Sequence, residues 1–208
     1  MRVSRMLAVG GWLLAVVSLP GWAVTVDRVA ARIDQQVLTV SEINQMAEIR
    51  FFPVSDPQQI LEALIAQALR FRDVERFGAQ DIPKDSIETR LQEIQRRFAT
   101  PEEFTAAVQR AELTLDEVRA LVKRELQVEA YIQERFSPLI FVSTEEIETY
   151  YRGPWSEQRR ARGLPIPPLA EATEEIRTLL KSSRLQEQIE EWTSQLRARA
   201  NVDIYAWK

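Results

Sequence analysis

The stretch VDRVAARIDQQVLTVSEI, residues 26–43, alternates apolar and polar side chains up to a polar turn, DQQ. Val29, Ala31 and Ile33 fall on one face of its first half, and arginines fall on the other. Such period-two alternation is typical of a half-buried strand. The apolar VLTV after the turn predicts the second strand of a short hairpin. Ser41 then has the position and chemistry of the N-cap of a helix.

The other end of the chain, VDIYAWK (residues 202–208), alternates in the same way. A two-stranded hairpin is at best marginally stable by itself. We therefore expect the C-terminal segment to add a third strand, which would bring the two ends of the chain together. The predicted fold class is mostly α: a helical domain with a small antiparallel sheet formed by the N-terminal hairpin and the C-terminal strand.

Helices are expected between these strands, and most begin at a recognisable cap. Asp56, Thr100 and Thr114 each stand three residues before Gln or Glu, the spacing of a capping box, and Ser143 caps a shorter helix. The last helix is predicted from about Leu169 to Ala200. At 1.5 Å per residue it would span ~48 Å, which is longer than one small neighbour can cover.

Residues 1–23 have the pattern of a secretory signal peptide. Arg2 and Arg5 precede an apolar run that ends at Leu19, and small residues stand before a cleavage point near Ala23. The run is shorter than the ~20 residues that a bilayer needs. We therefore expect an exported mature chain from residue 24, with no stable membrane insertion after the signal is removed.

The composition excludes several kinds of chemistry. The chain has no His and no Cys, which removes Ser-His-Asp and Cys-His catalysis, thiol redox chemistry and the usual zinc sites. The mature chain has only Gly78, Gly153 and Gly163, too sparse for a phosphate-binding loop. A net charge of −4 at pH 7 does not suit nucleic acid. The sequence thus predicts a protein that is not an enzyme and has no cofactor, metal or nucleic-acid partner.

In their order along the chain, three segments resemble the N-terminal domain of SurA-type periplasmic chaperones. These are the hairpin and capped helix of residues 26–43, STEEIETYY at residues 143–151, and the long helix and closing strand of residues 167–205. The resemblance implies export to the periplasm. In that family a parvulin prolyl-isomerase domain commonly separates the second of these segments from the third.

Only a short stretch, YYRGPWSEQRRARGLPIPPL, stands at that place here, and a domain needs at least ~50 residues. The resemblance therefore implies one discontinuous domain, residues 24–152 and 169–208, joined by a linker over residues 153–168 where a parvulin domain is absent. The alternative is that Tyr150, Tyr151, Trp155 and the arginines near them form a patch that binds a ligand.

By this resemblance, the chain is expected to be a holding chaperone without isomerase activity, which binds unfolded or unassembled envelope proteins through exposed apolar surface. Candidate peptide-binding residues are Phe51, Phe52, Tyr150, Tyr151 and Trp155, with core packing as the alternative for each. The alternative function is a structural or assembly partner of one specific envelope protein. The short linker beside a terminal helix also leaves open a domain-swapped homodimer.

The missing domain and the missing histidines predict that the protein does not catalyse prolyl isomerisation. A proline-containing chromogenic peptide should isomerise at the same rate with the mature protein and in buffer alone. Acceleration that is lost when the protein is removed from the reaction would contradict this prediction.

Overall fold

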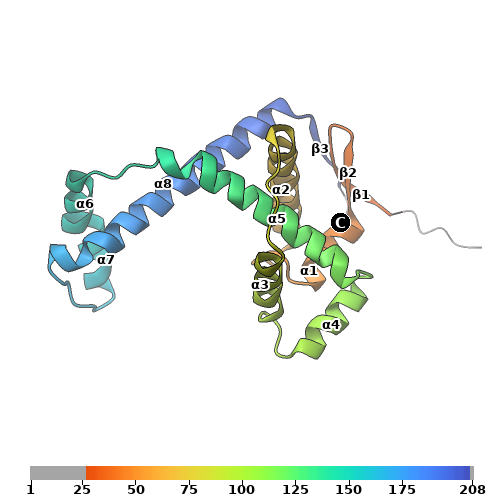
Figure 1. The fold of residues 1–208 in the computed structure, drawn as a ribbon, viewed down its shortest axis with the longest axis horizontal. Helices are drawn as coiled ribbons and strands as arrows, with labels where there is room; N and C mark the ends of the chain where they lie inside the picture. Colours follow the sequence, from red (N-terminus) through yellow and green to blue (C-terminus); the bar gives the residue numbers. More distant parts are fainter. Residues whose placement is uncertain (1–26, 207–208) are drawn as a thin grey trace, which may run out of the picture.

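The computed structural model describes residues 27–206, so the expected signal peptide and its cleavage point lie outside the described residues. The strands are β1 (Val29–Ile33), β2 (Gln36–Thr39) and β3 (Val202–Ile204). The helices are α1 (Val40–Glu48), α2 (Pro57–Phe77), α3 (Lys84–Gln95), α4 (Pro101–Arg110), α5 (Leu115–Arg135), α6 (Thr144–Tyr150), α7 (Ser156–Ala161) and α8 (Leu169–Arg199), with short helical turns at Ser137–Leu139 and Tyr151–Trp155. This arrangement confirms the predicted fold class (Figure 1).

The sheet has the order β2-β1-β3, with both neighbours antiparallel to β1. Ile33 lies opposite Gln36 on β2 and opposite Val202 on β3. The turn needs no glycine because Asp34 itself takes a positive φ of 53°, and its carboxylate accepts the backbone N–H of Asn201 at 2.9 Å. The C-terminal strand therefore closes the hairpin of its own chain. A swapped dimer stays a prediction.

Two local expectations at the N-terminal end are wrong. Thr39, not Ser41, is the N-cap of α1, because its side chain forms a full capping box with Glu42. The alternation of β1 is interrupted by a register shift between Val29 and Ala31. This irregularity leaves Val29 exposed although the sequence placed it on the inner face.

The other predicted caps are present, but only some are complete boxes. Thr114 and Ser143 each exchange two hydrogen bonds with the Glu three residues later. Thr100 and Asp56 accept a backbone N–H from the residue three positions on. At Thr100 the capping box is incomplete, because the Glu103 carboxylate accepts the backbone N–H of Ala99 instead of that of Thr100.

The main core lies between the sheet and helices α1–α5, and the C-terminal half of α8 packs onto it. Its fully buried large side chains include Ile33, Ile43, Phe51, Ile60 and Leu69. Trp192 and Leu196 of α8 belong to this core, as the sequence predicted for the apolar side of the long helix.

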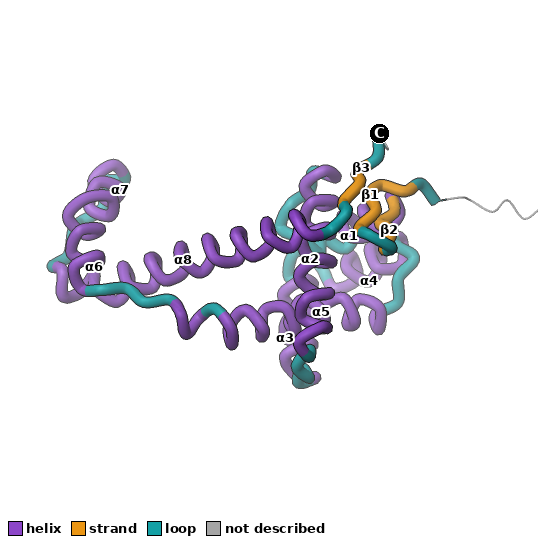
Figure 2. The backbone as a smooth tube through the Cα atoms, turned by 90° about the horizontal axis from the view of Figure 1, so that it is seen from above, coloured by secondary structure: helices purple, strands orange, loops and turns teal. Residues whose placement is uncertain are grey.

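A second, smaller core lies at the far end of α8, beside α6 and α7 (Figures 1 and 2). We call this end of the molecule, residues 140–180, the outer lobe. Its buried side chains are Val142, Ile147, Trp155, Ala172 and Ile176. Among the described helices, α8 is the one that contributes buried side chains to both cores.

The stretch expected to be a linker, residues 153–168, is an ordered part of the outer lobe. It contains α7, and its proline-rich end is held by side chains: the hydroxyl of Tyr151 donates to the Pro167 carbonyl and Arg159 donates to the Pro165 carbonyl, both at 2.8 Å. Trp155, at the end of the helical turn before α7, is buried. The segment therefore supplies part of a core as well as a connection.

Arg184, on α8 between the two cores, binds the segment where the chain enters the outer lobe, residues 141–146. Its guanidinium donates to the backbone carbonyl of Phe141 and to the carboxylate of Glu146. Glu146 also accepts the backbone N–H of Ser143 at 2.8 Å. The N–H of Ser143, followed by the guanidinium of Arg184, lowers the pKa of Glu146 to about 2.

Ile176→Ala should loosen the outer lobe and leave the main core intact. Ile176 is fully buried in a core with few buried residues, and such truncations cost ~2–5 kcal/mol. In native-state hydrogen exchange, amides of α6 and α7 should exchange faster, while amides of β1 and α2 keep their protection. The matched control is Leu179→Ala on the same helix, because Leu179 is 46% exposed. Equal loss of protection throughout the molecule would contradict two separable cores.

Glu146→Gln should remove a pH-dependent part of the stability. The folded-state pKa lies below the ordinary 4.5, so ionised Glu146 stabilises the fold above that pH, and this contribution is lost as the pH falls toward 2. The difference in melting temperature between wild type and variant should therefore be largest near neutral pH and shrink to zero by about pH 2. Glu145→Gln, which changes the adjacent exposed carboxylate, should show no such trend. A pH-independent difference for Glu146→Gln would contradict the assignment.

Candidate functional site

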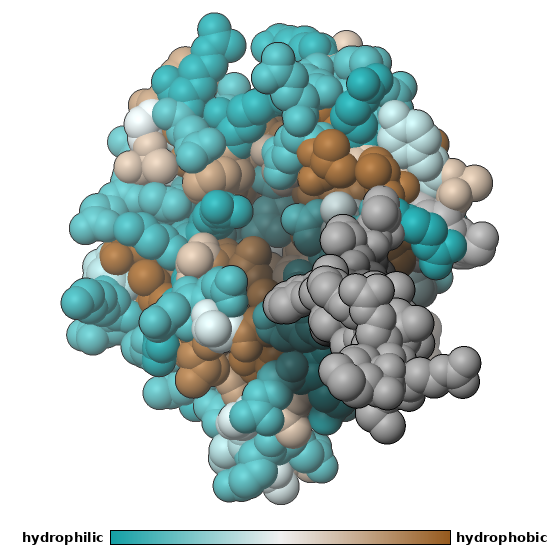
Figure 3. Space-filling view, turned by 90° about the vertical axis from the view of Figure 1, so that its right-hand side faces the viewer, coloured by the Kyte–Doolittle hydropathy of each residue, from teal (hydrophilic) through white to brown (hydrophobic). Residues whose placement is uncertain are grey.

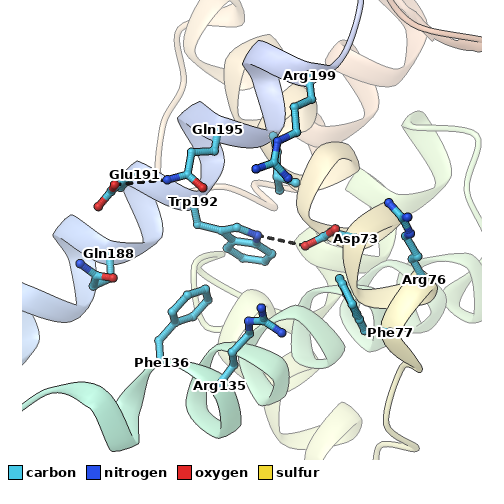
Figure 4. Close-up of a pocket in the computed structure, with 11 residues that line it drawn as sticks. Asp73, Arg76, Phe77, Arg135, Phe136, Gln188, Glu191, Trp192, Gln195 and Arg199 are labelled. Carbon is cyan, nitrogen blue, oxygen red and sulfur yellow. Dashed lines mark hydrogen bonds between the residues drawn. The ribbon is translucent and has the colours of Figure 1, made fainter.

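A concave site lies where the C-terminal ends of α2 and α5 meet the C-terminal half of α8. We call it the Trp192 pocket (Figure 4). Its volume is about 360 Å³. The residues that line it are Asp73, Arg76 and Phe77 from α2, Arg135 and Phe136 from the end of α5, and Gln188, Glu191, Trp192, Gln195, Leu196 and Arg199 from α8.

Aromatic rings form one side of this pocket. The ring of Trp192 lies 5.5 Å from Tyr131 and 5.4 Å from Phe136, centroid to centroid. Phe77 stacks on Tyr131 at 6.3 Å and remains 59% exposed. Such contacts fix the rings without covering them completely. Phe77 therefore presents an aromatic surface to solvent on a rigid support.

The helix ends explain why these rings converge. Phe77 is the last residue of α2, which stops at Gly78 with a φ of 97°. Phe136 is the C-cap of α5, where the chain leaves the helix. α8 crosses these two helix ends, so Trp192 contacts both of them. Its ring packs against Phe136 at the end of α5, and its indole N–H donates to the carboxylate of Asp73 on α2 at 3.1 Å. Figure 4 shows this bond spanning the pocket between α8 and α2.

Three arginines stand among the lining residues, one from each helix. The guanidinium of Arg135 lies over the rings of Phe77 and Tyr131, at 5.3 and 5.6 Å from their centroids. Within residues 27–206, no carboxylate lies within 4.0 Å of the side-chain nitrogens of Arg76, Arg135 or Arg199. The pocket therefore combines aromatic surface with guanidinium groups whose N–H donors are open to a ligand.

Burial raises the pKa of the Tyr131 phenol, so the ring beneath Phe77 stays neutral. Residues 27–206 contain no group of three or more His, Cys, Asp or Glu side chains placed to hold a metal ion. In the same part of the chain, no helix combines the length and the hydropathy needed to cross a membrane.

An apolar groove lies on the opposite face of α2, between α2, α5, α1 and the hairpin. It consists of two adjoining cavities of about 250 and 220 Å³ that share Leu64, Leu121, Glu42 and Arg124. The guanidinium of Arg124 lies 5.5 Å from the ring centroid of Phe71, over one wall. In the view onto the end of the molecule that carries the sheet, apolar patches are separate and surrounded by polar side chains (Figure 3). Such polar rims keep a protein with apolar grooves in solution.

Comparison with known proteins gives one consistent result. Over 158 residues the chain is 30% identical to the chaperone SurA of Pseudomonas putida, covering 68% of this chain and 37% of the relative. It is 28% identical over 137 residues to the chaperone SurA of Pseudomonas fluorescens (61% and 32%) and 24% identical over 141 residues to that of Saccharophagus degradans (62% and 33%). The chain is related to the SurA chaperones. No protein-family model matches it, and it spans about a third of the length of these curated relatives.

The relationship to SurA confirms the resemblance found in the sequence, but the structure places the five predicted site residues away from the Trp192 pocket. Phe51 is buried in the main core, and Phe52 packs edge-on against it at 5.2 Å. Trp155 is buried in the outer lobe, where Tyr151 stacks on it at 5.4 Å and Tyr150 packs beside it. Core packing therefore accounts for Phe51 and Trp155, which do not form exposed surface. The five residues fall into two separate groups.

Little in the sequence indicates the residues that do form the pocket. Phe77, Phe136 and Trp192 come from α2, the end of α5 and α8, and are spread over more than 100 positions. The available signals were a phenylalanine directly before a helix-ending glycine and another at a helix C-terminus. Each also fits ordinary packing, so only their convergence in space marks a site.

Proposed function

We propose that the chain is an exported holding chaperone that binds unfolded or unassembled envelope proteins through the Trp192 pocket, without isomerase activity. The observation that carries the proposal is the exposed aromatic surface of Phe77, fixed on a rigid aromatic support and surrounded by polar side chains. The relationship to SurA chaperones supports the class of function, and the periplasm is the compartment that the proposal implies.

The dimensions of the pocket suit a segment of unfolded chain. A volume of about 360 Å³ has room for one or two side chains. Aromatic rings bury much surface at low cost in side-chain entropy, so they bind apolar side chains of varied shape. A site that reads only one or two side chains holds many different clients weakly. Weak and broad binding is what a holding chaperone requires.

The proposal also assigns the domain arrangement. Residues 24–152 and 169–208 form one discontinuous domain of the SurA N-terminal type, and the short segment of residues 153–168 stands where related chaperones carry an isomerase domain. The burial of Trp155 and the hydrogen bond from the Tyr151 hydroxyl to the Pro167 carbonyl support this assignment, because they pack the short segment into the outer lobe. Client holding and isomerisation would then be separate activities, and this chain would keep only the first.

Phe77→Ala should weaken the suppression of client aggregation by the mature protein. The side chain is largely exposed, so its removal should change the melting temperature little while it removes the open face of the pocket. Light scattering of several unrelated denatured envelope proteins, diluted into buffer with and without chaperone, measures the effect. The concentration of variant needed for half suppression should rise about three- to tenfold, as expected for one aromatic contact.

Phe141→Ala is the matched control, because Phe141 is 75% exposed on the connection between α5 and α6 and does not line the pocket. It should suppress aggregation as well as the wild type does. Equal activity of both variants and the wild type would place client binding elsewhere. Suppression for one client only would favour the alternative of a specific assembly partner.

A further inference from the structure

We infer that the Trp192 pocket selects segments of unfolded chain in which an acidic residue adjoins an aromatic one. This inference rests on the proposed function and adds a rule of specificity: the aromatic side chain of the client packs against Phe77, and its neighbouring carboxylate binds the arginines of the rim.

The residues that line the pocket carry a net positive charge, whereas the whole protein is negatively charged. The ionisable lining residues are three arginines and two carboxylates, whereas the whole chain carries a net −4. Both carboxylates already accept hydrogen bonds inside the pocket: Asp73 from the indole of Trp192 at 3.1 Å, and Glu191 from the amide of Gln195 at 3.2 Å. These donors are neutral, so the carboxylates keep their charge, and three arginines against two carboxylates leave the lining net positive. None of the three guanidinium groups has a carboxylate within 4.0 Å among the described residues.

The arginines of the described chain divide in this respect: ten of the 21 have a carboxylate within 4.0 Å, and those of the pocket are among the eleven that have none. Arg197, two positions before Arg199 on α8, is paired with Glu62 at 2.5 Å. Arg32 is paired with Asp203 at 2.6 Å, and Arg90 lies within reach of three glutamates on α3 and α5. The protein thus provides carboxylate partners for many of its arginines but leaves those of the Trp192 pocket without one.

The position of Arg135 explains why the client's aromatic side chain and its carboxylate should be neighbours. Its guanidinium carbon lies over the rings of Phe77 and Tyr131, at 5.3 and 5.6 Å from their centroids, and a guanidinium presents N–H groups in a planar fork along its edge. A carboxylate is the ligand that matches this edge, since it can accept two parallel N–H bonds. Because Arg135 and Phe77 are in contact, the carboxylate and the aromatic ring of the client must lie on neighbouring residues.

Peptides with blocked ends test this rule. An acetylated, amidated and fluorescein-labelled peptide with one phenylalanine between two aspartates is compared with the same peptide carrying asparagines, and with a version whose phenylalanine is alanine. Fluorescence anisotropy gives the three dissociation constants for the mature protein. The asparagine peptide should bind about three- to tenfold more weakly than the aspartate peptide, and this difference should shrink between ~0.05 and ~0.5 M salt.

Arg76→Gln/Arg199→Gln removes two rim charges while it leaves Arg135 and the aromatic wall in place. This variant should lose part of the preference for aspartate, because Arg135 still binds the carboxylate, and should keep its preference for phenylalanine over alanine. Arg160→Gln/Arg162→Gln is the control, because it changes the net charge equally at exposed positions of the outer lobe. That control should behave as the wild type does.

The outcomes separate the two proposals. Equal binding of the aspartate and asparagine peptides, with the alanine peptide weaker, overturns the acidic rule and leaves the chaperone function standing. Equal binding of the phenylalanine and alanine peptides overturns the pocket as a client site, and the rule with it. The control variant and the pocket variant could lose the aspartate preference equally. That result would mean attraction to net charge alone, and it also overturns the rule.

Discussion

The antiparallel pairing of β3 with β1 determines the course of the rest of the chain. A hairpin without a third strand is marginal, and the third strand comes from the other end of the sequence, more than 160 residues away. The contacts of Asp34 with Asn201 and of Arg32 with Asp203 hold this junction. Because β3 follows α8 directly, the pairing brings the C-terminal half of α8 onto the main core, where Trp192 and Leu196 pack.

The length of α8 then creates the second core. A helix of 31 residues extends far beyond the body that its C-terminal half covers, so its N-terminal half needs its own apolar cover. The segment between α5 and α8 provides this cover with Val142, Ile147 and Trp155. Arg184 sits between the two cores and binds the entrance of the outer lobe through Phe141 and Glu146. The outer lobe is thus a small unit whose order depends on one helix that it shares with the main core.

The Trp192 pocket is a consequence of the same geometry. Three helices present their C-terminal portions at one place, and helix ends carry side chains that no regular neighbour covers. Phe77 and Phe136 are left at such ends, while Trp192 is held from the side by Asp73. Its arginines also suit helix C-terminal turns, where cations are favoured by the helix dipole. One structural cause therefore supplies both the aromatic and the positive character on which the proposed function depends.

Local sequence patterns predicted most of the fold. Period-two alternation at both ends predicted the strands, and caps at Thr114 and Ser143 predicted where helices begin, because these signals depend on side chains within a few residues of one another. They failed at Thr39 and Val29, where the bulge shifts the register by one position. Tertiary structure alone decided which aromatic side chains are exposed. Phe51 and Trp155 are buried and Phe77 is not, since exposure depends on which distant helix passes over each ring. No local pattern carries that information, so the site became visible only once α2, α5 and α8 had been placed together.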